Sequence, residues 1–224
     1  MNKFQTSAPV TAIIDIPAGR IELVAVDGLS AATVDVRPAD ADKSRDVTEA
    51  ERIRIGFADG VLRIESPEAE SKVFGKFGSL DVTVQLPAGS RVQAKAAAAD
   101  LVGTGRLGDI DFEAAQGDVT LDATGAARLV VQAGDLTVGR LGGAAELRTQ
   151  KGSLRVAEAV TGAVLLETMQ GDISIGAAPG VSATLDAGTA QGRISNSLRN
   201  SDGAAAALNI RATTMQGDIA AHSN

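Results

Sequence analysis

Acidic residues recur once per repeat along the second half of this chain, and a column of carboxylates could bind a hard cation such as Ca²⁺. The series consists of Asp100, Asp118, Asp135, Asp172 and Asp218. Ser153 and Arg193 occupy the same position in two further repeats and interrupt the column, and no Gly-Gly-x-Gly-x-Asp calcium repeat is present. We therefore expect no metal site. Four Gly-Asp pairs are instead predicted to be structural corners, where glycine supplies a positive φ and aspartate caps a backbone N–H: Gly117 and Asp118, Gly134 and Asp135, Gly171 and Asp172, Gly217 and Asp218.

Glutamines precede several of the corner glycines, at Gln116, Gln170, Gln191 and Gln216. Stacked amides can hydrogen-bond to one another along a pile of strands, so these residues predict a structural ladder. Gln132 and Gln150 lie one position away from this register. We therefore expect the ladder to be interrupted.

Other motifs give little support for catalysis or for a cofactor. The segment Gly103–Gly108 matches G-x-G-x-x-G, but a strand-like pattern follows it instead of the helix that a dinucleotide site requires. The single histidine, His222, is close to the carboxyl end, where we expect fraying. The sequence shows no Ser-His-Asp set and no Walker loop. We expect no cofactor and no enzymatic activity; a carboxylate-based hydrolase or lyase is the alternative.

The composition limits the partners and the compartment. The net charge is −7, which argues against a nucleic-acid binder that tracks phosphates. The chain has no cysteine, its amino terminus has no apolar signal-peptide region, and no apolar run approaches the roughly 20 residues of a membrane span. These features predict a cytoplasmic protein without direct membrane insertion.

The elements that position these residues recur about every 18 residues, which indicates a repeat architecture. Each unit has a Gly-Asp strand, in which apolar and polar residues alternate, and a second strand about half a unit away. Alternation with a period of two predicts one buried and one exposed face. We predict an all-β, single-domain β-solenoid, a β-helix-like stack of two-strand rungs; an antiparallel β-sandwich is the alternative.

The amino-terminal part differs from the repeats. We predict that residues 1–98 form an atypical cap of hairpins within the same domain and that residues 99–224 form the repeat stack. Asp59-Gly60 marks a hairpin between two strand-like stretches, and residues 46–51 predict a short helical turn.

Three surfaces are candidates for interaction with an unknown protein partner. One is the exposed side of the Gly-Asp strands, represented by Thr120, Thr137, Arg155 and Ser174; another is the glycine-rich loop that carries Phe74 and Phe77. The third is an end of the stack, where unpaired backbone groups favour self-association. The irregular unit 192–216 and the tail after it are expected to cover one end, which leaves the other for a second copy.

Two features indicate a relationship to a known family. One is the alternation of Gly-Asp-(Ile/Leu)-x-(Ile/Val) strands with Gly-x-(Val/Ala)-x-Leu strands, and the other is the Pro-Ala-Gly turns of the first half. The chain resembles a bacterial β-strand-repeat family of unknown function, the toastrack domain, whose members are described as putative adhesins. The resemblance implies a β-helix-like stack, and it links many members to envelope-stress signalling. We expect a non-enzymatic interaction or scaffolding module; a cell-surface adhesin exported by a non-Sec route is the alternative.

Overall fold

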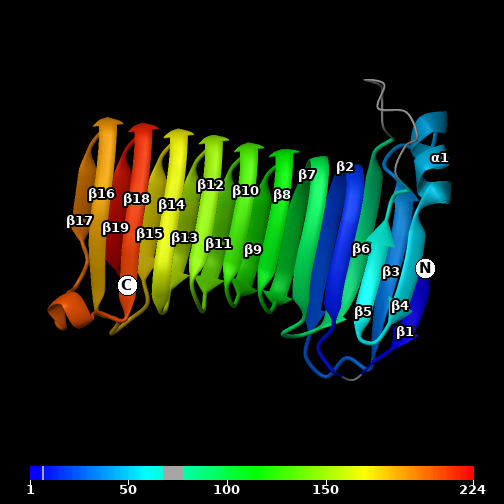
Figure 1. Ribbon diagram of the computed structural model, residues 1–224, viewed down its shortest axis with the longest axis horizontal. Coiled ribbons are helices and arrows are strands. Elements are labelled where there is room, and N and C mark those ends of the chain that lie inside the picture. The colour runs from blue at the N-terminus through cyan, green and yellow to red at the C-terminus, as the bar shows by residue number, and fades with distance from the viewer. Residues whose placement is uncertain (7, 68–77) are drawn as a thin grey trace.

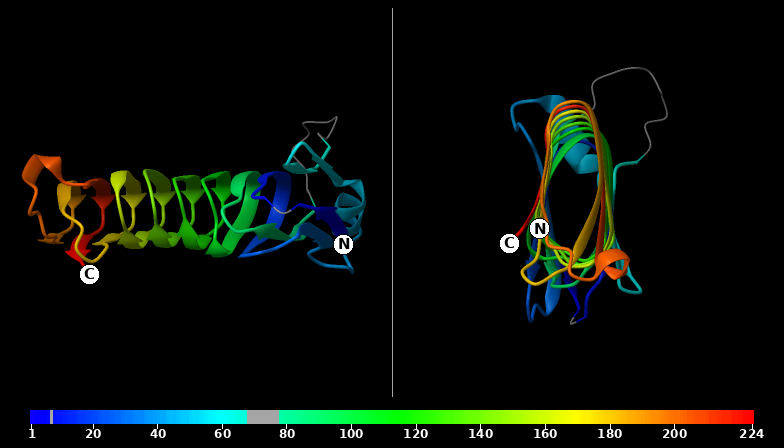
Figure 2. Two further views of the ribbon diagram at one scale, coloured as in Figure 1. Left: turned by 90° about the horizontal axis from the view of Figure 1, so that it is seen from below. Right: turned by 90° about the vertical axis from the view of Figure 1, so that its left-hand side faces the viewer.

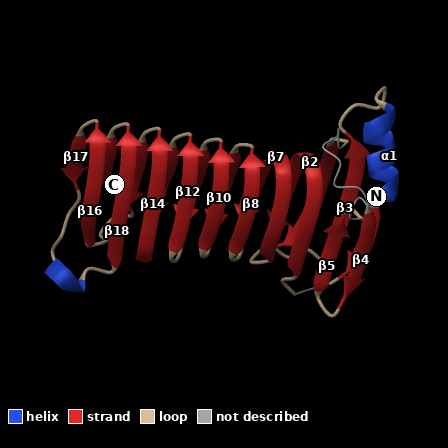
Figure 3. Cartoon of the chain, turned by 45° about the horizontal axis from the view of Figure 1, so that its top comes forward, coloured by secondary structure: helices blue, strands red, loops and turns tan. Residues whose placement is uncertain are grey.

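The computed structural model describes residues 1–6, 8–67 and 78–224, and these form an elongated, flattened coil of β-strands (Figures 1 and 2). The 19 strands of these described residues belong to one continuous sheet. Helix is limited to α1 (Ser44–Arg52) and the short turn η1 (Gly203–Ala205) within the described residues (Figure 3). In these residues no helix has the length and apolar character needed to cross a membrane.

The repeat stack has two layers, which lie in front and behind in Figure 1. The front layer contains β8 (Ile110–Gln116), β10 (Ala127–Ala133), β12 (Ala145–Lys151), β14 (Gly162–Gln170), β16 (Ala183–Gln191) and β18 (Leu208–Gln216). The back layer contains β9 (Val119–Thr124), β11 (Leu136–Leu141), β13 (Leu154–Ala159), β15 (Ile173–Ala177), β17 (Ile194–Ser197) and β19 (Ile219–Ser223). Every pairing within these layers is parallel. The predicted β-solenoid is therefore confirmed, and the antiparallel sandwich is not.

The core consists of columns in which equivalent residues of successive rungs lie over one another. Leu129 of β10, for example, is in register with Phe112 of β8 and Leu147 of β12, and all three are fully buried. Small branched side chains suit such columns because each rung repeats the shape of the one below it. The core columns are accordingly filled mainly by Val, Ile, Leu and Ala.

The amino-terminal end combines two long strands with short antiparallel ones. β2 (Thr11–Val26) and β7 (Arg91–Arg106) pair in parallel, and each contributes to both layers. Beyond β2 lie β5 (Val61–Glu65) and β6 (Leu80–Pro87), followed by the antiparallel β4 (Arg54–Ala58), β3 (Ala31–Pro38) and β1 (Asn2–Gln5). β4 and β5 form the predicted Asp59-Gly60 hairpin, α1 covers the predicted helical turn, and position 98 lies inside β7.

Aromatic stacking closes the core at this end. The ring centroids of Phe4, on β1, and Phe57, on β4, lie 5.4 Å apart, so the two layers are joined by a stacked pair. The edge strands also carry charged residues, Lys3 and Arg54, which discourage the addition of further strands.

The last two rungs are stacked in the reverse of their order in the chain. β18 lies between β14 and β16, and β19 lies between β15 and β17. The expectation that unit 192–216 and the following tail cover the end is therefore only partly right: β17, from this unit, forms the end together with β16, whereas β18 and the tail strand β19 lie inside the stack.

One side chain gives the physical reason for this order. The register places Asn196 of β17 in the inward column that holds Ile175 and Ala221. An amide buried there without hydrogen-bond partners would cost free energy, whereas at the end of the stack Asn196 stays exposed. β19 supplies Ala221 at this position, so β19 can occupy the interior.

Candidate functional site

The corner glycines join the front layer to the back layer, and each lies directly on the corner of the next rung. Gly117, Gly134, Gly171 and Gly217 have φ values of 137°, 152°, 148° and 149°. A Cβ atom on Gly134 would lie 2.0 Å from the carbonyl oxygen of Gly117, and one on Gly171 would lie 2.0 Å from that of Gly152. Glycine is needed here both for its φ and for the close approach of two backbones.

The aspartates after these glycines hydrogen-bond from rung to rung. Oδ1 of Asp118 accepts the backbone N–H of Asp135 at 2.8 Å, and Oδ1 of Asp172 accepts that of Asp218 at 2.8 Å. At the end of the column Asp218 accepts the backbone N–H of Arg193 and pairs with its guanidinium at 3.1 Å; these contacts lower the pKa of Asp218. The carboxylates are thus engaged with backbone donors. Within the described ranges no group of three acidic or histidine residues could hold a metal ion.

Buried threonines support the same corners from inside, a feature that the sequence analysis missed. Thr149, Thr168 and Thr214 are buried, and their hydroxyls donate to the carbonyl oxygens of Gly134, Gly152 and Gly171, at 3.3, 3.0 and 3.1 Å. Thr189 at the end of the stack repeats the contact. A threonine three residues before a corner glycine recurs in these four rungs, and this recurrence could have revealed the ladder.

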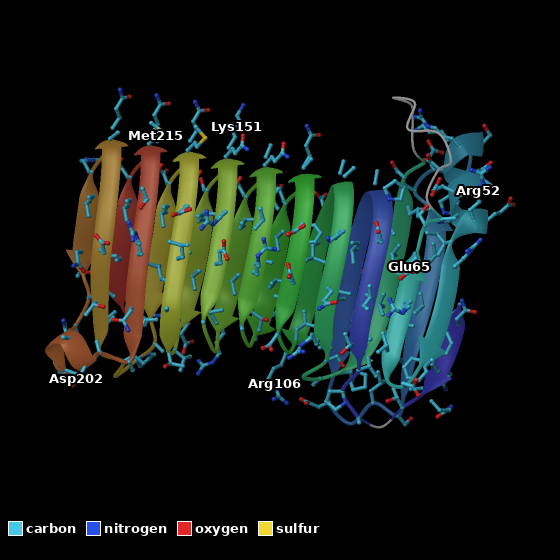
Figure 4. All side chains as sticks on the ribbon, in the orientation of Figure 1. Arg52, Glu65, Arg106, Lys151, Asp202 and Met215 are labelled. Carbon is cyan, nitrogen blue, oxygen red and sulfur yellow. The ribbon has the colours of Figure 1, made fainter. Side chains whose placement is uncertain are left out.

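The predicted glutamine ladder is short. Gln170 and Gln216 each donate an amide N–H to the next glutamine oxygen at 3.5 Å, which links Gln170, Gln216 and Gln191. Gln116 is separated from them because Ala133 and Lys151 occupy the intervening rungs. Lys151 projects from this corner in Figure 4, and Met215, separated from it by β14, has about half of its surface exposed.

The outer surface of the front layer, which we call the charged face, is a network of ion pairs. Arg128 contacts Asp111 at 3.1 Å and Glu113 at 2.5 Å. Arg148 contacts Glu146 at 2.6 Å and Glu167 at 2.9 Å. The hydrogen bond from Arg128 lowers the pKa of Glu113, and the same contact raises the pKa of Arg128. Charges on this face thus compensate one another across neighbouring rungs.

The outer surface of β9, β11, β13, β15, β19 and β17, which we call the flat face, differs in chemistry. The register aligns Thr120, Thr137, Arg155 and Ser174 in one column, so the structure brings these four predicted residues together. The column continues through Ala220 to Ser195. In this column, small hydroxyl and methyl groups flank one long side chain, and an ion pair between Arg140 and Glu158 lies farther along β11 and β13. Among the described residues, no carboxylate forms a salt bridge with Arg155.

The remaining sequence motifs occupy structural positions. Gly103–Gly108 spans the end of β7 and the turn that follows, and the next element is the strand β8. His222 lies within β19, in register with Gly176 and Ser197, so the expectation of a frayed residue is wrong. Phe74 and Phe77 lie outside the described residues.

Comparisons with known proteins agree with this geometry. The family model described as Toastrack DUF4097 matches residues 30–224. No curated protein matches the chain. Among solved structures, a putative adhesin from Bacteroides fragilis aligns with a TM-score of 0.50 at 14% identity, over 100% of this chain and 95% of that one. A putative cell adhesion protein from Clostridium sporogenes aligns with a TM-score of 0.35 at 12% identity, over 100% and 98% of the two chains. The chain belongs to the toastrack DUF4097 family.

Proposed function

We propose that this toastrack domain is a non-enzymatic scaffold that binds a protein partner through the flat face, in the bacterial cytoplasm. The observation that carries the proposal is the contrast between the two faces. Charges on the charged face are paired across rungs, whereas Arg155, among small side chains, forms no salt bridge with any residue that the structure describes. Arginine is enriched at the energetic centres of protein interfaces, and it can form paired hydrogen bonds with a carboxylate.

The geometry of the flat face suits a protein surface more than a small molecule. Its side chains alternate with buried ones along parallel strands, so they form a regular array. The hydroxyls of Thr120, Thr137 and Ser174 can donate or accept hydrogen bonds at fixed spacings along the stack. A partner that presents a carboxylate beside backbone groups would match this array. The family resemblance supports a partner that acts in envelope-stress signalling.

Affinity capture from the native host tests the proposal with two matched pairs of variants. Arg155→Ala removes the cation of the flat face, and Arg211→Ala removes an exposed arginine of the charged face. Thr120→Lys and Thr213→Lys add the same charge at exposed threonines of the two faces. We expect the flat-face variants to bind a captured partner at least about tenfold more weakly, as for an interface hot spot. Equal binding by both members of each pair would contradict the proposal.

The second candidate function is that of a cell-surface adhesin exported by a non-Sec route. It draws on the description of the Bacteroides fragilis protein, whose similarity to this chain shows the fold alone. Fractionation of the native cell separates the two candidates. Protein found only in the cytosol would end the adhesin hypothesis, and protein found on the surface would end the scaffold hypothesis.

A further inference from the structure

The end of the stack formed by β16 and β17 is open, and it presents two strand edges at once. Within the described part of the chain β16 pairs only with β18, and β17 pairs only with β19. The outer edge of each strand therefore offers backbone N–H and C=O groups for a further strand. Residues 199–202 lie beside the start of β16, where Ala183 donates its N–H to the carbonyl of Arg199, and they leave the rest of the edge free.

Apolar residues of the core columns are also uncovered at this end. Ile194 is 47% exposed, whereas Ile173 and Ile219, in the same column, are 1% and 0% exposed. Leu185 and Ala187 pack against the core from one side only and are half-buried. One more rung would bury these three residues as the interior rungs bury their counterparts. Asn196, which it would also cover, keeps a hydrogen-bond partner at this end, because its Oδ1 accepts the backbone N–H of Leu198 at 3.0 Å.

The charge distribution favours a second copy of the chain at this end. The whole chain has a net charge of −7, so most surfaces of two copies repel each other. Residues 181–202 form the open end and carry two acidic residues, Asp186 and Asp202, and two basic residues, Arg193 and Arg199, which cancel. Asp202 projects at the lower corner of this end in Figure 4, whereas Arg193 follows the corner glycine at the opposite corner. A two-fold axis would bring each Asp202 toward the Arg193 of the other copy.

We propose that a second copy of this chain covers the open end, tail to tail, with β16 and β17 each antiparallel to the same strand of the other copy. A single peptide strand could cover one edge, but only another two-layer end of the same width covers both. Because the opposite end is closed by the Phe4 and Phe57 stack, the assembly stops at two copies. The strand Ala183–Gln191 is symmetric about Ala187, so the matching register places each Ala187 opposite its counterpart and Asp186 opposite Gly188.

Sedimentation equilibrium or light scattering over a wide concentration range tests the proposal. The wild-type mass should rise toward twice the monomer mass, and Ile194→Lys should remain monomeric because dimerisation would bury its ammonium group among the apolar core residues of this end. Far-UV circular dichroism and the thermal midpoint of Ile194→Lys should match those of the wild type at a concentration where the wild type is monomeric, since this residue lies at the end of the stack. Thr213→Lys, on the neighbouring strand β18, is the control and should dimerise like the wild type.

Cysteine cross-linking tests the geometry, since the natural chain has no cysteine. Ala187→Cys should form a disulfide-linked dimer under mild oxidation, whereas Thr213→Cys should not. A monomeric wild type at every concentration, or a dimer formed equally by Ile194→Lys, would overturn the proposal. A dimer that Ala187→Cys fails to cross-link would place the interface elsewhere and would also overturn it. Because Arg155→Ala leaves this end unchanged, failure here is distinguishable from failure of the flat-face proposal.

Discussion

Replacement of a corner glycine tests whether the rungs stack as closely as the structure indicates. In Gly171→Ala, the new Cβ would lie 2.0 Å from the carbonyl oxygen of Gly152 and 2.5 Å from its carbonyl carbon. Both contacts are far inside van der Waals distance, so the two backbones must separate. The φ of +148° is also unfavourable for alanine.

The expected cost can be worked out from these contacts. Backbone strain at a residue that needs glycine contributes about 1–3 kcal/mol. Displacement of the Gly152 carbonyl also weakens its hydrogen bond from Thr168, which is worth about 1 kcal/mol. We therefore expect Gly171→Ala to lower the free energy of unfolding by about 2–4 kcal/mol. With a urea m-value of about 2 kcal/mol/M, the unfolding midpoint falls by about 1–2 M.

Far-UV circular dichroism in urea is the suitable assay, since the chain has no Trp or Tyr for fluorescence. Gly188→Ala is the matched control, because a Cβ atom there meets nothing within 4 Å and its φ is not positive. Its free energy of unfolding should stay within about 0.5 kcal/mol of the wild type. Equal midpoints for Gly171→Ala and Gly188→Ala would refute the argument from corner stacking.

Three further predictions concern the hydroxyl ladder, the charged face and the order of the rungs. Thr168→Val keeps the side-chain shape but removes the donor to the Gly152 carbonyl, so the free energy of unfolding in urea should fall by about 1 kcal/mol. The pKa of Glu113 is lowered in the folded state, so the ionised side chain stabilises the fold above its ordinary pKa of 4.5. This stabilisation is lost as the pH falls through the lowered pKa. Arg128→Gln removes the cause of the shift, so a plot of the thermal midpoint against pH should be flatter in this range than for the wild type. Ala221→Asn buries an amide in the core column and should cost about 2–3 kcal/mol, whereas Asn196→Ala at the open end should be nearly neutral in the same urea assay.

The repeat and its corners are readable from the sequence because they depend on local rules. Alternation with a period of two assigns Val119 and Leu121 to the core and Thr120 to the surface, and the burial of these residues agrees. A glycine recurring at a fixed interval marks the same backbone turn in each rung. Thr168 is less readable, because even a recurring threonine does not indicate which group its hydroxyl contacts. Its role depends on the carbonyl of Gly152, which belongs to the previous rung.

The charged face could not be assigned from the sequence, since its ion pairs join residues of different repeats. Arg128 contacts Asp111 and Glu113, which lie one repeat earlier, and the pairing depends on the parallel register. The same register places Arg155 between Thr137 and Ser174, and no carboxylate of the described ranges pairs with it. The stacking of the rungs therefore determines that the charges of the charged face are paired and that Arg155 on the flat face is available to a partner.

The sequence by itself determined the period, the buried and exposed sides of each strand, and the glycine corners, because each follows from residues close together in the chain. The tertiary structure decided the order of the last two rungs, and with it which end of the coil stays open. That choice depends on whether Asn196 or Ala221 enters a column shared with Ile175, many residues away. Local patterns cannot rank these alternatives, because both rungs fit the same repeat and differ mainly in the cost of burying one amide.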